Sequence, residues 1–224
     1  MKLFVGIPAY DRKLSVETCR SLLIEQGAAA LMGVEMSVCF APGSSALHYA
    51  RDKIAHDFLA SDADKLVFVD ADVAWGPGSL IRLASHDVDF VGGAYRHKAP
   101  DETYPVHWAS DTGELWADPA TGLLEVKALA TGFLSLSRDV FRRLAEKQGD
   151  RMYDFGPDRL HSFFWFPPGR GEDYALCDEW RETSGKVWLD PELTLSHVDG
   201  GHHYTGRIGD LLRARMAADH KDAA

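Results

Sequence analysis

The feature that most constrains this chain is a short apolar segment that runs directly into two aspartates. Residues 65–69 read Lys-Leu-Val-Phe-Val, and such a run, rich in β-branched side chains, is typical of a buried strand. Asp70 and Asp72 follow at once, separated by one alanine. In an open α/β sheet, ligands bind in the crevice beyond the carboxyl ends of the strands. We therefore expect the two carboxylates at a binding crevice, with a polar turn after the strand as the simpler alternative.

The two carboxylates also suit a hard divalent cation. Oxygen ligands of this kind favour Mg²⁺ or Mn²⁺, and such an ion in turn holds phosphate oxygens. One aspartate is expected to contact the metal, and the other to bond a sugar hydroxyl or a metal-bound water. Because Asp-x-Asp is a short motif, this prediction depends on what the rest of the chain brings to the same crevice.

The first seventy residues predict a parallel sheet. The expected elements are a strand at 2–7, a helix at 14–26, a strand at 35–40, a helix at 47–59 and the strand at 65–69. This β-α-β-α-β order implies parallel strands with helices on the faces of the sheet. The loops at 10–11, 42–45 and 70–72 would then meet at one edge, which predicts a single crevice.

Beyond Trp75 the pattern is less regular, with an irregular stretch at 96–121 and a long aromatic-rich loop at 153–170. The expected elements are a short helix at 77–84, strands at 89–95 and 123–128, helices at 138–147 and 172–183, short strands at 186–190 and 193–197, a loop at 200–206 and a helix at 208–218. We therefore predict an α/β fold with an open, mostly parallel sheet, helices on both faces and a small antiparallel region.

Composition narrows the function classes. The chain has 224 residues, of which 46% are hydrophobic and 26% charged, as in an ordinary globular protein. Its net charge of −10 gives no electrostatic support for a nucleic-acid partner. Cys19, Cys39 and Cys177 are far apart and odd in number, so neither a zinc ribbon nor a disulfide framework is indicated. The cysteine pattern therefore makes a reducing cytoplasm the expected location. No segment is long enough for a membrane span.

Three more charged residues are candidates for chemistry. Glu172 and Asp173 stand at a predicted helix start, where the helix dipole favours carboxylates, so capping is the simplest interpretation. Arg51 lies on the helix after the 42–45 loop. Arginine is suited to bidentate contact with phosphate, but the sequence alone favours a solvated helix position.

A glycine-bearing loop carries several histidines. His197 follows a predicted strand, and His202 and His203 come shortly after two glycines. Neutral imidazole is a common metal ligand, so the group is a candidate for metal binding. The aromatic-rich loop at 153–170 is either a lid or sugar-stacking surface, or a satellite hydrophobic cluster.

Taken together, these segments resemble the GT-A class of nucleotide-sugar-dependent glycosyltransferases, over most of the chain and in the same order. The similar segments are Gly-Ile-Pro-Ala-Tyr at 6–10, Ala-Arg-Asp-Lys-Ile-Ala at 50–55, Val-Asp-Ala-Asp at 69–72, Thr-Gly-Phe at 131–133, Gly-Glu-Asp-Tyr at 171–174, Lys-Val-Trp-Leu-Asp-Pro at 186–191 and Leu-Ser-His at 195–197. The portion from 171 to 191 is the more specific half. Within the class, the likeness is to small bacterial and phage enzymes and to the Anp1-like mannosyltransferases.

The resemblance implies a role for each candidate. Metal contacts would come from Asp70, Asp72 and His197. Donor contacts would come from Pro8, Tyr10, Asp11, Arg51, Asp70 and Gly132. The catalytic residues would be Glu172 and Asp173, with Asp173 as general base if the reaction inverts.

Two positions depart from the family pattern. Asp52 stands where asparagine is usual, which puts a nucleotide contact there in question. Asp199 interrupts the expected His-Val-Gly spacing, so His202 or His203 competes with His197 as metal ligand.

The resemblance implies one GT-A domain over 1–224, with a nucleotide-binding half at 1–95 and an acceptor-side half at 96–224. Its activity would be metal-dependent transfer, with Mn²⁺ or Mg²⁺, from a UDP- or GDP-sugar to a hydroxyl of a glycan, protein or other acceptor. One alternative is a nucleotide-sugar- or glycan-binding protein on the same fold. Another is a haloacid-dehalogenase-like phosphatase, although Ala74 stands where that motif has Thr or Val.

Overall fold

The computed structural model describes residues 1–44, 46–110 and 115–222, so Ser45 of the predicted 42–45 loop lies outside the described residues. The helices are α1 (Val16–Leu31), α2 (Leu47–Ala60), α3 (Ser79–Ser85), α4 (Arg138–Gln148), α5 (Glu172–Glu182) and α6 (Ile208–Asp222). The strands are β1 (Lys2–Ala9), β2 (Glu35–Pro42), β3 (Lys65–Val69), β4 (Val73–Trp75), β5 (Phe90–Gly92), β6 (Val106–Trp108), β7 (Leu124–Leu129), β8 (Phe133–Ser137), β9 (Met152–Phe155), β10 (Asp158–His161), β11 (Val187–Leu189), β12 (Leu195–Asp199) and β13 (His202–Gly206).

The main sheet has eight strands in the order β2-β1-β3-β8-β5-β11-β7-β6. β1 pairs in parallel with both β2 and β3, and β11 pairs in parallel with β5. Within this described sheet, β7 and β8 run against the direction of the other strands. The predicted open, mostly parallel sheet is confirmed.

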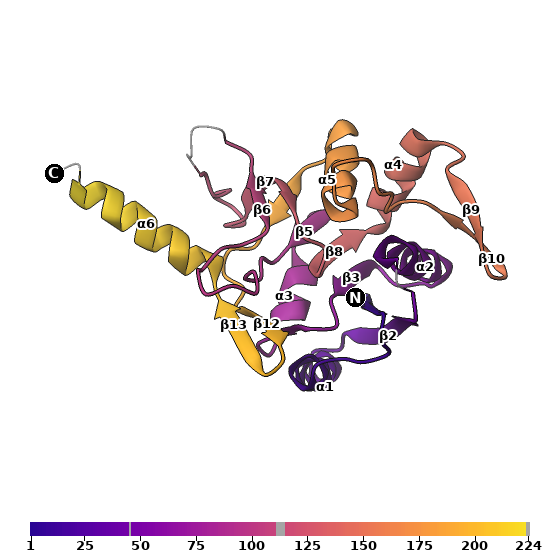
Figure 1. Ribbon diagram of the computed structural model, residues 1–224, viewed down its shortest axis with the longest axis horizontal. Helices are drawn as coiled ribbons and strands as arrows, with labels where there is room; N and C mark the ends of the chain where they lie inside the picture. Colours follow the sequence, from indigo (N-terminus) through magenta and orange to yellow (C-terminus); the bar gives the residue numbers. More distant parts are fainter. Residues whose placement is uncertain (45, 111–114, 223–224) are drawn as a thin grey trace.

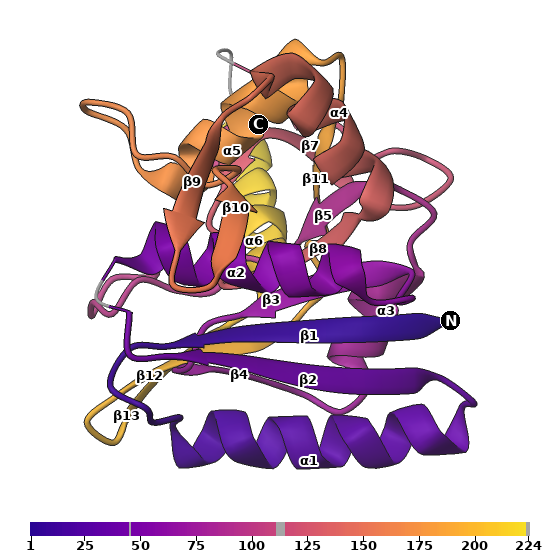
Figure 2. The same cartoon turned by 90° about the vertical axis from the view of Figure 1, so that its right-hand side faces the viewer.

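Helices cover both faces of this sheet, as predicted. Alternate residues of a strand point to opposite faces. Phe4 and Phe68 accordingly pack with residues of α2, α4 and α5, whereas Val5 and Val67 pack with residues of α1 and α3. Figures 1 and 2 show α1 and α2 on opposite sides of the strands at the N-terminal end of the sheet. Two apolar layers therefore hold the sheet rigid beneath its loops.

A small antiparallel sheet, in the order β13-β12-β4, joins the main sheet through the two aspartates. β3 belongs to the main sheet and β4 to the small one, and residues 70–72 form the turn between them. In the small sheet His197 of β12 pairs with Val73 of β4. This sheet confirms the predicted antiparallel region and brings residues near the C-terminus beside the turn.

Several predicted loops contain strands. The predicted loop at 200–206 holds β13, which forms a hairpin with β12 across Gly200 and Gly201, both at positive φ. The predicted loop at 153–170 begins with the β9–β10 hairpin. β8 was not predicted either, and it lies between β3 and β5. α6 extends away from the body of the molecule (Figure 1).

Among the described residues, no helix combines the length and the apolar character that crossing a bilayer requires.

Candidate functional site

A cleft lies where the carboxyl ends of β1 and β3 meet, as the parallel order predicts. Its volume is about 540 Å³. Its lining residues are Pro8, Tyr10, Asp11, Lys13, Leu14, Ser15, Ser44, Leu47, Asp70, Ala71 and Asp72. The structure thus brings three of the predicted donor-binding residues and both aspartates to one hollow. Tyr10 is 66% exposed, so its ring face is open to a ligand.

The two aspartates sit in a tight turn with different surroundings. The Val73 N–H donates to the Asp70 carbonyl at 3.1 Å, and the Asp70 N–H donates to the Gly132 carbonyl at 3.0 Å. The Asp72 carbonyl accepts from the Val198 N–H of β12 at 2.8 Å. The backbone of Asp70 is therefore tied to Gly132, next to β8, and to Val73 of β4, and that of Asp72 is tied to β12.

Both carboxylate oxygens of Asp70 are held by hydrogen bonds. Arg51 Nη2 lies 3.2 Å from Oδ1, and the Tyr95 hydroxyl donates to Oδ2 at 3.1 Å. Gly132 packs against the same carboxylate so closely that a Cβ atom there would collide with it. Gly132 therefore leaves the space that Asp70 occupies. Tyr95, which the sequence analysis did not single out, fixes the orientation of Asp70.

Arg51 joins the turn to the start of α5. Its side chain is 3% exposed, and its guanidinium contacts Asp70 and also Glu172, with Nη1 at 2.6 Å from Oε1. A planar guanidinium with donors on several nitrogens can bridge two carboxylates in this way. Arg51 is therefore buried between two candidate site residues, so the solvated position that the sequence favoured is wrong.

Asp72 faces a histidine and a lysine. Its Oδ2 lies 3.4 Å from His197 Nε2 and 2.7 Å from Lys98 Nζ. Burial raises the pKa of Asp72, but the His197 ring, when it is protonated, and the Lys98 ammonium outweigh this effect and lower the pKa to about 2. Asp72 is thus an ionised carboxylate at neutral pH. Lys98 lies in the irregular 96–121 stretch, where no sequence pattern marked it.

The orientation of His197 follows from its hydrogen bonds. Nδ1 lies 2.9 Å from the Arg96 carbonyl, which can only accept, so we assign the proton to Nδ1. In the neutral ring, Nε2 then presents its lone pair to Asp72. The Tyr95 ring packs edge-on against the imidazole, with centroids 4.9 Å apart. The Arg96 carbonyl and the Tyr95 ring therefore fix the orientation of the His197 ring.

The other two histidines of the predicted loop lie on β13, and both are exposed. His203 Nε2 is 3.2 Å from Glu17 Oε1, so it pairs with α1. His202 is opposite Asp199 in the hairpin. Of the histidine alternatives that the sequence left open, His197 is the one in contact with Asp72 in the described structure.

Asp72 and His197 are the two side chains whose positions suit a bound metal ion. Within residues 1–44, 46–110 and 115–222, no three His, Cys, Asp or Glu side chains group closely enough to hold an ion by themselves. Metal–ligand bonds of about 2.0–2.2 Å place neighbouring ligands about 3 Å apart, and the 3.4 Å between Asp72 Oδ2 and His197 Nε2 is close to this. Mg²⁺ is commonly held by one or two carboxylates plus substrate phosphates. The pair therefore fits an ion that is completed by a phosphate-bearing ligand.

The start of α5 carries a second carboxylate, that of Asp173, next to the carboxylate of Glu172. Asp173 follows Glu172 in the first turn, and its Oδ1 accepts from the Tyr174 N–H at 2.8 Å. Burial raises the pKa of Asp173, and the nearby Arg51 partly offsets this. A carboxylate with a raised pKa is a stronger proton acceptor than an ordinary one.

Asp52 has a structural role. It is fully buried and accepts hydrogen bonds from the Phe164 N–H at 2.9 Å and the Tyr153 hydroxyl at 3.0 Å. Desolvation raises the pKa of Asp52 to about 7, although these two hydrogen bonds lower it in part. The carboxylate ties α2 to the aromatic-rich segment, away from the lining of the cleft.

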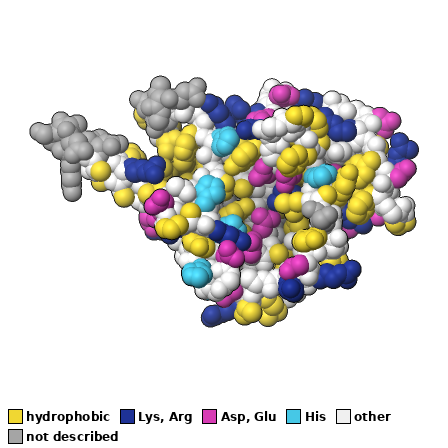
Figure 3. All heavy atoms as spheres, viewed as in Figure 1, with side chains coloured by type: hydrophobic (Ala, Val, Ile, Leu, Met, Phe, Trp, Pro, Cys, Tyr) yellow, Lys and Arg dark blue, Asp and Glu magenta, His cyan; other side chains and the backbone are white. Residues whose placement is uncertain are grey.

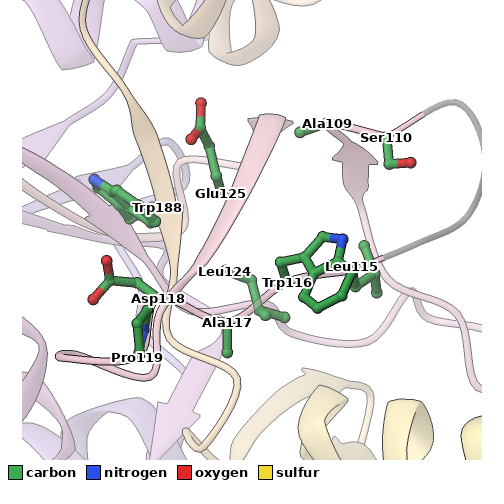
Figure 4. A pocket seen from close by; sticks show the side chains of 10 residues that line it. All are labelled: Ala109, Ser110, Leu115, Trp116, Ala117, Asp118, Pro119, Leu124, Glu125 and Trp188. Atoms are coloured by element: carbon green, nitrogen blue, oxygen red, sulfur yellow. The ribbon is translucent and has the colours of Figure 1, made fainter.

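A second hollow, of about 510 Å³, lies beside β7 and β11 (Figure 4). Asp118 there accepts hydrogen bonds from Thr121 and Ala120, and Glu125 pairs with Lys186 at 2.8 Å. Asp118 and Glu125 in this hollow therefore already have hydrogen-bond or ion-pair partners within the protein. By contrast, acidic side chains gather with basic and histidine side chains near the middle of the face in Figure 3.

No protein-family model matches the chain, and a comparison with curated proteins finds no match. Solved structures do match. A197 from STIV is similar over 90% of this chain and 87% of its own, at a TM-score of 0.54 and 17% identity. GalNAc-T7, solved with UDP, GalNAc and Mn²⁺, is similar over 89% of this chain but 44% of its own, at a TM-score of 0.53 and 14% identity.

A variant of Drosophila β1,4-galactosyltransferase 7, in complex with manganese, UDP-Gal and xylobiose, is similar over 92% of this chain and 70% of its own, at a TM-score of 0.50 and 13% identity. At these identities the likeness concerns the fold. The chain has the GT-A fold, the architecture that its sequence motifs predicted.

Proposed function

We propose that this protein is a metal-dependent glycosyltransferase, which moves a sugar from a nucleotide diphosphate sugar to a hydroxyl acceptor. The observation that carries the proposal is the cleft at the carboxyl ends of β1 and β3, lined by Pro8, Tyr10, Asp11, Asp70 and Asp72 in a chain with the GT-A fold. Because the similar structures contain UDP and manganese, UDP-sugars with Mn²⁺ are the first donors to test, followed by GDP-sugars and Mg²⁺.

At the donor end, Pro8 and Tyr10 would cover the base and Asp11 would bond the ribose. Asp72 and His197 would hold the metal, which when bound supplies Lewis-acid stabilisation of the charge on the leaving diphosphate. Asp70, fixed by Arg51 and Gly132, would orient the ribose or a metal-bound water.

At the acceptor end, Asp173 would take the proton of the attacking hydroxyl if the reaction inverts. Glu172, held by Arg51, would face the donor sugar. In this scheme residues 1–95 bind the nucleotide and residues 96–224 bind the acceptor, which is a glycan, a protein or another hydroxyl compound. A cytoplasmic location remains part of the proposal.

Two alternative functions would need different properties of the same site. A haloacid-dehalogenase-like phosphatase would need Asp70 as a free nucleophile, but Arg51 and Tyr95 engage both of its oxygens. A binding protein would use the same cleft without turnover, so release of free nucleoside diphosphate from a nucleotide sugar separates it from a transferase.

The first experiment measures the thermal stability of the chain with UDP, GDP, CDP or ADP, each with Mn²⁺, with Mg²⁺ or with EDTA. A ligand at a hundredfold excess over its Kd stabilises a protein by about 2.7 kcal/mol. We expect one diphosphate to raise Tm, and to do so only when metal is present. A panel without any metal-dependent shift would contradict the proposal.

Asp72→Asn tests the metal assignment. We expect it to abolish the metal-dependent Tm shift and nucleotide-sugar turnover, because an amide is a poor ligand for a hard cation. Its Tm without ligand should stay within a few degrees of wild type, since the side chain is 37% exposed. Asp199→Asn, at an exposed position of the same small sheet, is the matched control and should behave as wild type. Undiminished turnover in Asp72→Asn would remove Asp72 from the metal site.

A further inference from the structure

Lys98 places an ammonium group at the position where a metal ion is expected. Its Nζ lies 2.7 Å from Asp72 Oδ2, and the same oxygen lies 3.4 Å from His197 Nε2. A divalent ion bound to this oxygen and an ammonium group at hydrogen-bond distance from it would repel each other at close range. The two cations are therefore competitors for one carboxylate oxygen.

A cation beside Asp72 is favourable when His197 is neutral. In its neutral form His197 presents a lone pair to the carboxylate, because its Nδ1 proton is used by the Arg96 carbonyl. Two electron-pair donors that face each other repel unless a positive charge lies beside them. Lys98 supplies that charge in the metal-free protein.

The segment that carries Lys98 can release it at low cost. Lys98 lies between β5 and β6, in a stretch with no helix or strand, and its side chain is 32% exposed. The hydrogen bonds that shape the stretch involve its neighbours, such as the His97 N–H to the Thr103 carbonyl at 2.9 Å and Arg96 Nη2 to the Pro100 carbonyl at 3.0 Å. A lysine side chain is flexible, so its head group can leave Asp72 by bond rotation alone.

We propose that Lys98 is a resident counter-cation of the donor site, which a divalent metal displaces from Asp72 and which thereby sets the metal affinity of the site. This inference rests on the proposed function in so far as Asp72 and His197 are taken to hold a metal. It assigns Lys98 a role in metal exchange: a cation lies beside Asp72 whether or not a metal is bound.

The test measures Mn²⁺ binding to the full chain from the loss of the free Mn²⁺ electron paramagnetic resonance signal. It is run without nucleotide and again with UDP, against a blank that holds UDP and no protein. Wild type is compared with Lys98→Met, Lys98→Gln and the matched control Lys13→Met. Lys13 lines the same cleft but pairs with Asp11, at 3.5 Å, so its loss removes an equal charge without touching Asp72. We expect both Lys98 variants to bind Mn²⁺ roughly three- to tenfold more tightly than wild type, and Lys13→Met to change the Kd less than about twofold.

The outcomes separate the inference from the proposed function. If the Lys98 variants bind Mn²⁺ with the wild-type Kd, or more weakly, the inference is overturned while the metal site stands. An equal tightening in Lys13→Met would also overturn it, because the effect would then reflect the charge of the cleft and not the contact with Asp72. If none of the proteins binds Mn²⁺, with or without UDP, the metal site itself fails, and the inference fails with it.

Discussion

At the scale of single residues, Arg51 is the side chain that connects the candidate site. Asp70 begins the turn after β3 and Glu172 begins α5, and Arg51 contacts both from α2, although it is 121 residues from Glu172 in the sequence. Its two carboxylate contacts offset part of the desolvation of the buried guanidinium, whose Nε has no hydrogen-bond partner among the described residues. Arg51 therefore connects the turn after β3 to the start of α5.

Replacing Arg51 should destabilise the whole protein. Arg51→Met leaves the Glu172 and Asp70 carboxylates without their cation, and breaking a buried pair in this way costs about 3–5 kcal/mol. Urea denaturation at pH 7 measures the loss. Adding Glu172→Gln to Arg51→Met should recover part of it, because the stranded charge is then removed. A loss under about 1 kcal/mol would show that the bridge contributes little.

At the scale of elements, the sequence predicted the long, periodic segments and missed the short strands. The β-α-β-α-β order of the first seventy residues is confirmed because apolar residues recur there at strand or helix spacing. β4 has three residues, too few to show a period. β13 could have been predicted, because Gly200-Gly201 between β-prone residues is a two-residue hairpin signal.

Part of the candidate site could also be predicted from the sequence, and part could not. Parallel strand order alone placed Tyr10, Asp11 and the two aspartates at one edge of the sheet. The contact between His197 and Asp72 depends on the pairing of β12 with β4, which joins residues far apart in the sequence and leaves no local signal. Lys98 was not predictable at all, since an exposed lysine in an irregular stretch has no distinguishing pattern.

The link between α2 and the β9–β10 hairpin should depend on pH. Asp52 accepts a hydrogen bond from Tyr153 of that hairpin, and burial raises the pKa of Asp52 to about 7. The pKa of an aspartate in the unfolded chain is about 3.9. Between about pH 4 and pH 7 the native state therefore binds one more proton than the unfolded state. Stability should therefore fall as pH rises through this range, by roughly 1.4 kcal/mol per pH unit at most.

Asp52→Asn measures this contribution. The amide oxygen can still accept from the Phe164 N–H and the Tyr153 hydroxyl, but it does not titrate. In urea denaturation at pH 5, 6, 7 and 8, the variant should lose the downward slope and exceed wild-type stability above pH 7. Asp57→Asn, on the same helix at a partly exposed position, should keep the wild-type slope. Parallel curves for wild type and Asp52→Asn would show that Asp52 is ionised in the native state throughout.

At the scale of the whole molecule, the two predicted halves share one sheet. β8, from the second half, lies between β3 and β5 of the first half, and β5 also pairs with β11. Both neighbours of β5 therefore come from beyond residue 95. The halves can differ in function, but the sheet gives them one fold.

A fragment of residues 1–95 should accordingly not fold by itself. It keeps β1, β2 and β3 but loses the partners of β5 and the α4–α5 layer, which covers Phe4 and Phe68. We expect no cooperative urea transition in circular dichroism and no dispersed amide signals in NMR spectra, whereas the full chain shows both. A cooperative transition in the fragment would mean that residues 1–95 are an independent domain.

The pairing of β12 with β4 limits where the chain can gain or lose residues without disturbing the site. Three consecutive residue pairs, ending with His197 opposite Val73, set the position of the imidazole. Because side chains alternate along a strand, a deletion or insertion of one residue between β11 and β12 that shifts this register would turn the imidazole to the other face of the small sheet. Changes of length at the Gly200-Gly201 turn lie beyond the ladder and leave it in register. Natural or engineered variants that keep the site should therefore vary in length at the hairpin tip and not in the 190–194 connection.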